Sequence, residues 1–216
     1  SGYIGLHCAS ELLKARFLVR ETVRNAAKPT EVCETLTSSS MDLSNLEMVE
    51  VDLTSENGWF DAASGCDYLM HVASPFSIAN PKSENEMIKP AVQGTLRVLK
   101  AANQANIKRV ILTSSIVAMM GDKKSGTFTP EDWTDANVKD VSTCAKSKTL
   151  AERAAWDFVK HRTDQNKFEL VVLNPGGVFG PPLGKNIEGQ SLAVLAQMLS
   201  RKQPVVPDVA FTMVDV

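Results

Sequence analysis

The sequence predicts an α/β protein built on a doubly wound parallel sheet. Two observations favour this fold class: segments with strand character alternate with segments of helical periodicity, and the strand segments are almost continuously apolar. Strands of that kind belong to parallel sheets that helices cover on both faces. In such folds, ligands bind beyond the carboxyl ends of the strands. No internal repeat or low-complexity tract interrupts the pattern.

Helical spacing of apolar residues is clear near the start of the chain, where Ile4, Cys8 and Leu12 recur every four residues. The segment Ser83-Glu-Asn-Glu86 has the pattern of a capping box ahead of a long helix, in which Pro90 should cause a bend or a delayed start. The predicted helices cover residues 4–14, 55–64, 84–106, 145–161 and 187–202, and the Ser- and Thr-rich stretch 24–46 is predicted as helix and loop.

Strand character comes from apolar runs bounded by turn residues. Val49, Val51 and Leu53 fall on one side of such a run, and Pro75 ends another because proline has no N–H to donate to a ladder. The predicted strands cover residues 17–23, 47–53, 66–73, 108–115 and 168–174, with tight turns at residues 175–177 and 180–182 and a further alternating run at 211–216.

Composition excludes several classes of protein. The 216 residues carry 23 Lys and Arg against 25 Asp and Glu, a formal net charge of -2, so no global basic field favours nucleic acid or an anionic membrane. The mean hydropathy is -0.09, and no apolar run approaches the roughly 18 residues of a membrane span. The chain opens without a secretory signal pattern. We therefore expect neither a nucleic-acid nor a membrane partner.

The four cysteines are scattered, with no C-x-x-C pair and no neighbouring histidines at metal-ligand spacing; they are Cys8, Cys33, Cys66 and Cys144. This usage predicts reduced thiols, a cytoplasmic location and no metal site. The chain starts without Met inside a glycine turn and stops in a strand-like run, so we expect a fragment of a longer protein.

Three groups of residues have the character of a nucleotide site, each with a plainer alternative. Gly2 and Gly5 precede a helix, where missing Cβ atoms let N–H groups approach a pyrophosphate, although such a pattern is often only a turn. Arg24 follows a strand where it could receive a 2′-phosphate, or could simply be solvated. Asp52 could accept from an adenine amine or cap a helix.

The order of short motifs then becomes specific. SGYIG, TVRN, VDL, HVASPF, RVILTSS, KSKTLAERAAW and NPGGVFGPPLG resemble successive blocks of the extended short-chain dehydrogenases/reductases, nearest to the dihydroflavonol reductase, cinnamoyl-CoA reductase and aldehyde reductase group of the NAD-dependent epimerase/dehydratase superfamily. The blocks follow family order over nearly the whole chain. The resemblance implies a Rossmann-type fold, NADPH rather than NAD as hydride donor, and a small carbonyl compound as acceptor.

The resemblance also implies roles for individual residues. Ser115, with Ser114 as the weaker candidate, matches the serine that hydrogen-bonds the substrate carbonyl, and Lys148 matches the lysine that holds the nicotinamide ribose and lowers the pKa of the acid. The remaining implied cofactor-binding residues are Gly2, Tyr3, Ile4, Gly5, Arg24, Lys28, Asp52, Leu53, Ala73, Ser74, Pro175, Gly176 and Val178. The pair Met119 and Met120, together with Phe76, could line a substrate pocket or belong to the core.

Two positions depart from the family. Cys144 stands where the family has the tyrosine of Y-x-x-x-K, its proton donor, and a thiol is a shorter and weaker donor than a phenol. Such a thiol beside Lys148 could alternatively have a lowered pKa and be oxidisable. The family's first strand, central in its sheet, is also absent, so we expect the sheet to be interrupted between the strands at 17–23 and 66–73.

The sequence thus predicts an NADP-binding Rossmann domain over residues 1–180 and the start of a substrate-binding region over 181–216. The predicted function is NADPH-dependent reduction of a small aldehyde or ketone. One alternative is a cofactor-binding pseudo-enzyme that Cys144 has disabled, and another is a nucleotide-sugar epimerase or dehydratase that uses NAD, against which Arg24 argues. The sequence leaves monomer and homodimer equally open.

Overall fold

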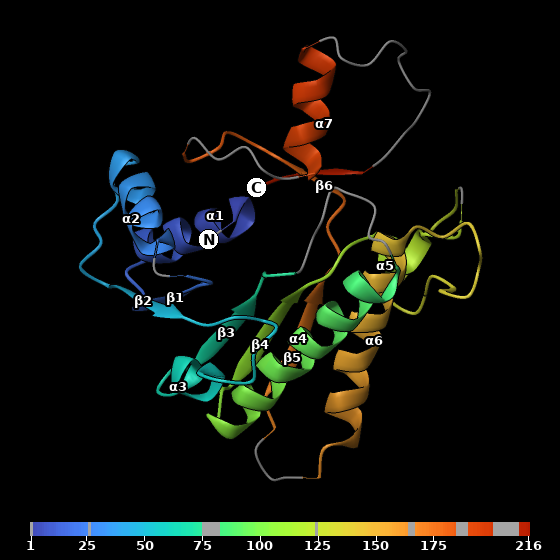
Figure 1. Ribbon diagram of the computed structural model, residues 1–216, viewed down its shortest axis with the longest axis horizontal. Coiled ribbons are helices and arrows are strands. Elements are labelled where there is room, and N and C mark those ends of the chain that lie inside the picture. Colours follow the sequence, from blue (N-terminus) through green and yellow to red (C-terminus); the bar gives the residue numbers. More distant parts are fainter. Residues whose placement is uncertain are drawn as a thin grey trace. The chain divides into compact units, whose positions relative to one another are not determined.

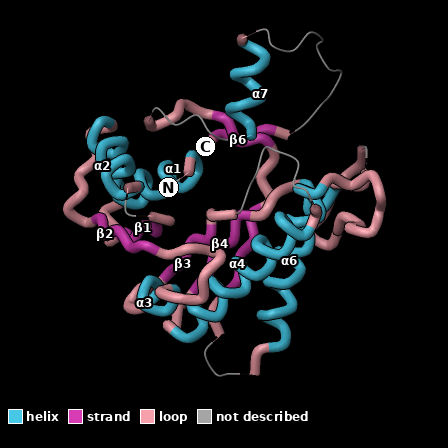
Figure 2. The backbone as a smooth tube through the Cα atoms, viewed as in Figure 1, coloured by secondary structure: helices cyan, strands magenta, loops and turns pink. Residues whose placement is uncertain are grey.

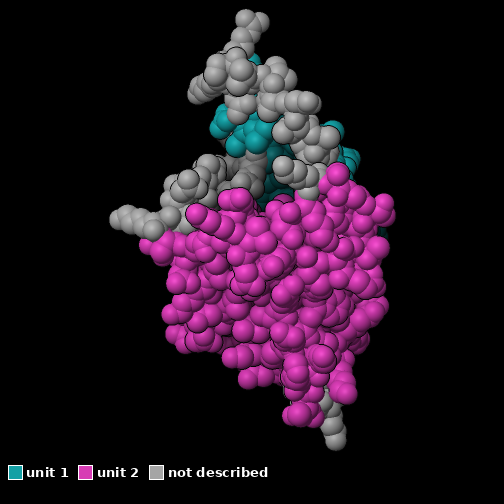
Figure 3. All heavy atoms as spheres, turned by 90° about the vertical axis from the view of Figure 1, so that its right-hand side faces the viewer, with its two compact units in different colours: residues 1–51, 176–216 teal, residues 52–175 magenta. Residues whose placement is uncertain are grey.

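A computed structural model describes residues 2–25, 27–74, 83–123, 125–163, 167–184, 190–200 and 212–216. The chain divides into two compact units, coloured separately in Figure 3. The first unit comprises residues 1–51 and 176–216, and the second comprises residues 52–175. Among the described residues, no helix is both long enough and apolar enough to cross a bilayer.

The second unit is built on a three-stranded parallel sheet of order β3-β4-β5. Its strands are β3 (Tyr68–His71), β4 (Arg109–Thr113) and β5 (Glu169–Leu173). Two long helices, α4 (Asn85–Gln104) and α6 (Thr143–His161), pack beside one another over this sheet (Figure 1). Two short helices, α3 (Trp59–Ala63) and α5 (Val117–Met120), complete the unit.

An apolar core lies between the sheet of the second unit and its two long helices. The buried members come from α4, α6, the strands β4 and β5 and the residues just before these strands, which shows that both helices turn their apolar faces to the same sheet. They are Leu99, Ala102, Ile107, Val110, Leu112, Ala155, Phe168 and Leu170. Pro90 lies inside α4, as predicted. The predicted capping box is wrong, because no side chain caps this helix and the N–H of Glu86 bonds to the carbonyl of Ser83 instead.

The first unit contains two small parallel sheets. In one, β1 (Val19–Val23) pairs with β2 (Leu46–Glu50), and the helices α1 (Tyr3–Lys14) and α2 (Lys28–Ser38) share its core. In the other, β6 (Gly177–Phe179) pairs with β7 (Met213–Asp215). The helix α7 (Gln190–Leu199) contacts β6, since the Val178 N–H of β6 donates to the hydroxyl of Ser191 in α7 at 3.1 Å. Figure 2 shows these helices and strands along the backbone.

Three helices end in the same way. The residue after the C-cap of α1, α2 and α4 has a positive φ: 62° at Arg16, 61° at Ser40 and 56° at Asn106. The following N–H then bonds five residues back, from Phe17 to the carbonyl of Leu12 in α1, with equivalent bonds after the other two helices. This is the Schellman arrangement, which satisfies carbonyl groups that the helix itself leaves unpaired.

The predicted fold class is confirmed: all the strand pairs described are parallel, and helices alternate with strands. The five predicted strands all form, each shorter than predicted. The described strands form three separate parallel sheets, β1-β2, β3-β4-β5 and β6-β7. The short elements α5 and β6 were not predicted, since four and three residues are too few for a periodic pattern.

Candidate active site

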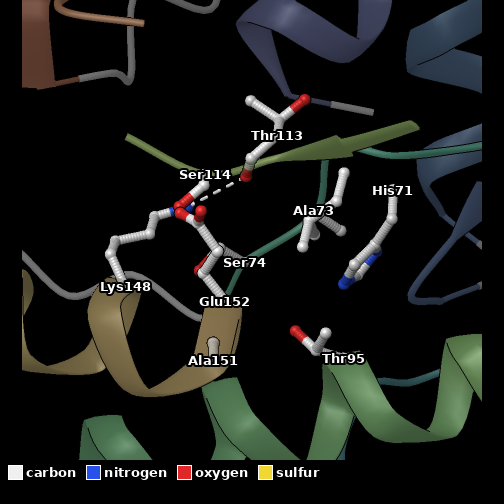
Figure 4. Close-up of a pocket in the computed structure, with 10 residues that line it drawn as sticks. His71, Ala73, Ser74, Thr95, Thr113, Ser114, Lys148, Ala151 and Glu152 are labelled. Carbon is white, nitrogen blue, oxygen red and sulfur yellow. Dashed lines mark hydrogen bonds between the residues drawn. The ribbon is translucent and has the colours of Figure 1, made fainter. Parts of the chain in front are cut away.

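A polar pocket lies at the carboxyl ends of β3 and β4, where α4 and α6 pass over the sheet (Figure 4). Parallel α/β folds bind their ligands at this edge. The pocket combines hydroxyl groups, a lysine, a histidine and a carboxylate; its lining residues are His71, Ala73, Ser74, Thr95, Leu112, Thr113, Ser114, Lys148, Ala151 and Glu152.

Lys148 reaches this pocket from the first turns of α6 (Figure 4). The helix starts where it does because the Ser142 hydroxyl accepts a hydrogen bond from the Ala145 N–H at 3.2 Å, which is an N-cap. The Lys148 ammonium donates to the carbonyl of Thr113, the last residue of β4, at 3.4 Å. Burial lowers the pKa of Lys148, while the Cys144 and Glu152 side chains act in the opposite direction.

The two candidate serines follow β4 and lie in different environments. The Ser114 side chain is buried and lines the pocket, and its hydroxyl has no hydrogen-bond partner in the described part of the chain. The Ser115 hydroxyl donates to the carbonyl of Pro175 at 3.5 Å and accepts from the Val117 N–H at 3.4 Å, both long. A buried hydroxyl without a partner is costly, so Ser114 is the serine whose surroundings call for a ligand or water.

Cys144 lies one helical turn before Lys148 on α6 and is half-buried. Burial raises the pKa of its thiol, and the positive charge of Lys148 offsets this only partly. The alternative of a low-pKa, easily oxidised cysteine is therefore wrong, because desolvation outweighs the nearby cation. At neutral pH, the thiol stays protonated.

A buried polar network behind the pocket was not predicted. Glu152, only 6% exposed, accepts a hydrogen bond from the Asn174 amide at 2.8 Å. The same amide nitrogen donates to the backbone carbonyl of Ser115 at 3.1 Å, so it connects the segments after β4 and β5 to helix α6. The i, i+4 spacing of Lys148 and Glu152 on α6 was visible in the sequence, but nothing in it marked Asn174 as the partner of Glu152.

His71 is the last residue of β3. The structure buries it, with 6% of its surface exposed, but its ring lines the pocket (Figure 4) and no hydrogen bond to it occurs among the described residues. Burial, and then the charge of Lys148, lower the pKa of His71 from 6.5 to about 4. The imidazole is therefore neutral at physiological pH.

Helix α5 holds the segment after Ser115 against the start of α6. Thr134, fully buried, donates its hydroxyl to the Val117 carbonyl and accepts from the Gly121 N–H, both at 2.7 Å. A Cβ on Gly121 would lie 2.9 Å from that of Ala145, so only glycine permits this approach. Met119 and Met120 on α5 are half-buried, and Phe76 lies outside the described residues.

The predicted cofactor residues of the second unit occupy two places. Ala73 and Ser74 line the pocket after β3 (Figure 4), and Pro175 receives the Ser115 hydroxyl and the Ile116 N–H. Asp52 and Leu53 form a separate turn in which one Asp52 carboxylate oxygen accepts from the N–H and hydroxyl of Thr54, both at 2.7 Å. The plainer alternative for Asp52 was helix capping, whereas its carboxylate stabilises a turn.

The first unit holds the predicted pyrophosphate site. Gly2 is the N-cap of α1 and has no side-chain cap, and nothing lies within 4 Å of where its Cβ would be. The N–H groups of the first helical turn, from Tyr3, Ile4 and Gly5, have no partner within the helix. A phosphate fits such an open helix N-terminus, because the N–H groups and the helix dipole both favour negative charge.

The other predicted residues of the first unit differ in their surroundings. Arg24 is exposed just after β1, whereas the Lys28 ammonium pairs with Glu31 at 2.6 Å. A Cβ on Gly176 would lie 2.1 Å from the Thr212 hydroxyl, and Val178 is buried in β6. Lys28 is thus engaged in an ion pair, Gly176 permits a close approach of Thr212, and Val178 packs inside its unit, so each of the three has a structural role of its own.

The side chain of Tyr3 contacts the loop after β6. Its hydroxyl donates to the Gly180 carbonyl at 3.0 Å, and its ring meets that of His7 edge-on, with centroids 5.2 Å apart. The imidazole of His7 in turn contacts the Pro181 carbonyl at 3.0 Å. Burial raises the pKa of Tyr3, and the Asp215 carboxylate adds to this effect. This tyrosine therefore serves to hold the loop through its neutral hydroxyl.

The parallel α/β fold and the polar carboxyl edge of its sheet are those of the Rossmann class of folds. The model of the NAD dependent epimerase/dehydratase family matches residues 1–210, and the chain belongs to this family.

Similar proteins are plant and yeast reductases. The chain is 35% identical over 199 residues to an anthocyanidin reductase ((2S)-flavan-3-ol-forming) of Vitis vinifera, covering 87% of this chain and 56% of that protein. It is 36% identical over 207 residues to a cinnamoyl-CoA reductase of Medicago truncatula, covering 90% and 60%. The crystal structure of yeast methylglyoxal/isovaleraldehyde reductase Gre2 complexed with NADPH is similar with a TM-score of 0.82 and 27% identity, over 99% of this chain and 68% of that one. The chain thus spans a little over half the length of these curated relatives.

Proposed function

We propose that the chain provides the cofactor-binding domain and catalytic residues of an NADPH-dependent reductase of small aldehydes or ketones. Residues 1–180 form the NADP-binding domain in this proposal, and residues 181–216 belong to the substrate-binding region. The observation that carries it is Lys148, a half-buried cation in a hydroxyl-rich pocket at the carboxyl edge of a parallel sheet. The names of the similar reductases and the NADPH of the Gre2 structure support the same assignment. The four cysteines, all free, support a cytoplasmic location.

NADPH would supply a hydride when bound. The open first turn of α1 would hold its pyrophosphate, Arg24 its 2′-phosphate, and Lys148 its nicotinamide ribose. The first two groups match their ligands by charge, since the pyrophosphate and the 2′-phosphate are anionic, and the Lys148 ammonium would donate hydrogen bonds to the ribose hydroxyls. Ser115, or Ser114 with its unpaired hydroxyl, would donate a hydrogen bond to the substrate carbonyl.

The proton donor is the weak point of the site. Cys144 holds its proton at neutral pH, because burial raises its pKa, but its side chain is short and a thiol is a weak hydrogen-bond donor. Loss of a positioned general acid removes about 10²- to 10⁴-fold in rate. This observation favours a second candidate function, in which the protein binds NADPH without efficient turnover.

Comparison of Cys144 with Cys144→Tyr tests the proposal. NADPH consumption is followed at 340 nm with a panel of small aldehydes and ketones, and Cys144→Phe is the matched control because it adds the ring without the hydroxyl. We expect the tyrosine variant alone to gain about 10²-fold or more in turnover. Binding of NADPH, measured by cofactor fluorescence, should be tight in all three proteins and tighter than binding of NADH.

Each other outcome has a distinct meaning. A cysteine form as active as the tyrosine variant would show that another group or a water donates the proton. NADPH binding with no measurable turnover by the cysteine form, whether or not the tyrosine variant turns over, would favour the second candidate function. Preference for NAD that stays bound through purification would contradict the assignment to NADPH and favour an epimerase or dehydratase. Failure to bind either nucleotide would overturn the proposal.

A further inference from the structure

The turn of residues 52–56 in the second unit carries Asp52 and Leu53, the predicted adenine contacts, and its own hydrogen bonds are short-range. The Asp52 carboxylate accepts from Thr54, and the Ser55 N–H donates to the Asp52 carbonyl at 3.0 Å. Such local bonds define a turn shape but do not fix the turn relative to the rest of its unit. A binding surface on this turn therefore depends on bonds from other elements.

Arg97 on α4 supplies the strongest of these bonds. Its Nη1 donates to the Leu53 carbonyl at 2.6 Å, and its Nε donates to the Glu56 carboxylate at 2.5 Å. The Arg97 side chain is only 13% exposed, whereas that of Glu56 is 71% exposed. Because a charged donor in a half-buried position binds a carbonyl more strongly than a neutral one, the contact to Leu53 is the one that holds the backbone.

The helix also approaches the turn closely in front of Arg97. Gly94 lies one helical turn earlier, and a Cβ there would sit 3.2 Å from Cδ2 and 3.3 Å from Cβ of Leu53. The missing side chain lets the Leu53 side chain rest directly on α4. Leu53 is thus held twice by one helix, through its carbonyl by Arg97 and through its side chain by the surface at Gly94.

A second anchor comes from α3. The indole Nε1 of Trp59 lies 3.1 Å from the carbonyls of both Asp52 and Ser55. The carbonyls of Asp52, Leu53 and Ser55 therefore all accept bonds from side chains outside the turn. Arg97 combines such a bond with a second one to the far side of the turn, at Glu56.

We propose that Arg97 is a positioning residue for the adenine end of the nucleotide site, which acts by holding the 52–56 turn in its binding conformation. The inference rests on the proposed function, because it takes Asp52 and Leu53 as the adenine contacts. Arg97 does not touch the nucleotide in this assignment. An arginine suits the role because its planar fork can donate in two directions at once, which a lysine ammonium on a flexible stem does less well.

Binding of the two halves of the cofactor distinguishes this role from a general structural one. The probes are 2′,5′-ADP for the adenine half and reduced nicotinamide mononucleotide for the other, each titrated calorimetrically into the wild type and into Arg97→Met. Arg109→Met is the matched control. Arg109 in β4 also pairs with a carboxylate, that of Glu169 in β5 at 2.7 Å, but it has no bond to the 52–56 turn among the described residues. We expect Arg97→Met to bind 2′,5′-ADP about tenfold more weakly, with the mononucleotide and the Arg109 variant unaffected.

Arg97→Lys keeps the positive charge and serves as a second variant in case Arg97→Met fails to fold. We expect its affinity for 2′,5′-ADP to lie between those of the wild type and Arg97→Met. Hydrogen exchange of the peptide covering residues 50–58 gives a readout that needs no nucleotide, and it should be faster in Arg97→Met than in Arg109→Met. Equal 2′,5′-ADP affinity in wild type and Arg97→Met, or unchanged exchange of the turn, would overturn the role of Arg97. A wild type that binds no 2′,5′-ADP would instead overturn the proposed function and the adenine assignment with it.

Discussion

The protonation of His71 gives a quantitative prediction about stability. Its imidazole is buried, lines the pocket together with Lys148 and Glu152, and has its pKa lowered to about 4 by burial and by the Lys148 charge. In the unfolded chain, the same group would titrate near 6.5. The unfolded state therefore binds a proton at a higher pH than the folded state does.

The sign and size of the effect follow from this difference. Between pH 6.5 and about 4, the unfolded state binds more protons, so the free energy of unfolding falls as the pH falls. The contribution of His71 is fully present above pH 6.5, declines between the two pKa values and is constant below pH 4. At about 1.36 kcal/mol for each pH unit, the total loss is about 3 kcal/mol.

Urea unfolding between pH 7.5 and 4 tests this prediction when His71→Gln is compared with wild type. Glutamine does not titrate, so the stability of the variant should fall less steeply with acid, by about 3 kcal/mol over the range. His161→Gln, at an exposed histidine, controls for the loss of one imidazole. The protein has three histidines, so NMR titration can follow each directly. Parallel pH profiles of wild type and His71→Gln would refute the reasoning, as would a His71 resonance that titrates near 6.5.

Three further predictions concern single side chains. Thr134→Val leaves two partly buried backbone groups, the Val117 carbonyl and the Gly121 N–H, without their hydroxyl partner, and it should lower the free energy of unfolding in urea by about 2 kcal/mol. Thr129→Val, at an exposed residue, should change it by less than about 0.5 kcal/mol. Similar losses in the two variants would contradict the structure. Cys144 should react with iodoacetamide slowly at pH 7 and faster only above the usual thiol range, because its pKa is raised; rapid alkylation at pH 7 would show a thiolate. Tyr3→Phe should cost about 1 kcal/mol through the lost bond to Gly180, measured by thermal unfolding, and an unchanged transition would mean that the bond is not formed.

The order of helices and strands could be predicted because each long element carries its own apolar pattern. Residues 4–14 and 145–161 have helical spacing, and the corresponding helices α1 and α6 begin within two residues of those bounds. The capping box before α4 could not be judged in this way. Its residues are correct in type, but the helix begins after Glu84, one residue later than the box requires, and Glu84 has a helical backbone in place of the extended one of a capping residue.

The candidate site was predictable where chemistry is carried by residue type and spacing, as with Lys148 and Cys144 on one helix. It was not predictable where a contact joins distant segments. The bond from Asn174 to Glu152 spans 22 residues and that from Arg97 to Leu53 spans 44, and neither has any local periodicity. Whether Ser114 or Ser115 lacks a hydrogen-bond partner likewise depends on the backbone after β4, where neighbouring side chains point to opposite sides.

The residues with left-handed backbone after α1, α2 and α4 are positions where the stability of this protein can be raised without changing the candidate active site. Arg16, Ser40 and Asn106 all have a left-handed backbone conformation, which costs a residue with a side chain about 1 kcal/mol and which glycine adopts without steric strain. Each helix here runs into the amino end of the strand that follows, which is the edge opposite to the ligand edge of a parallel sheet. Glycine at these helix ends would therefore raise the free energy of unfolding, which would allow the protein to tolerate destabilising substitutions in the active site.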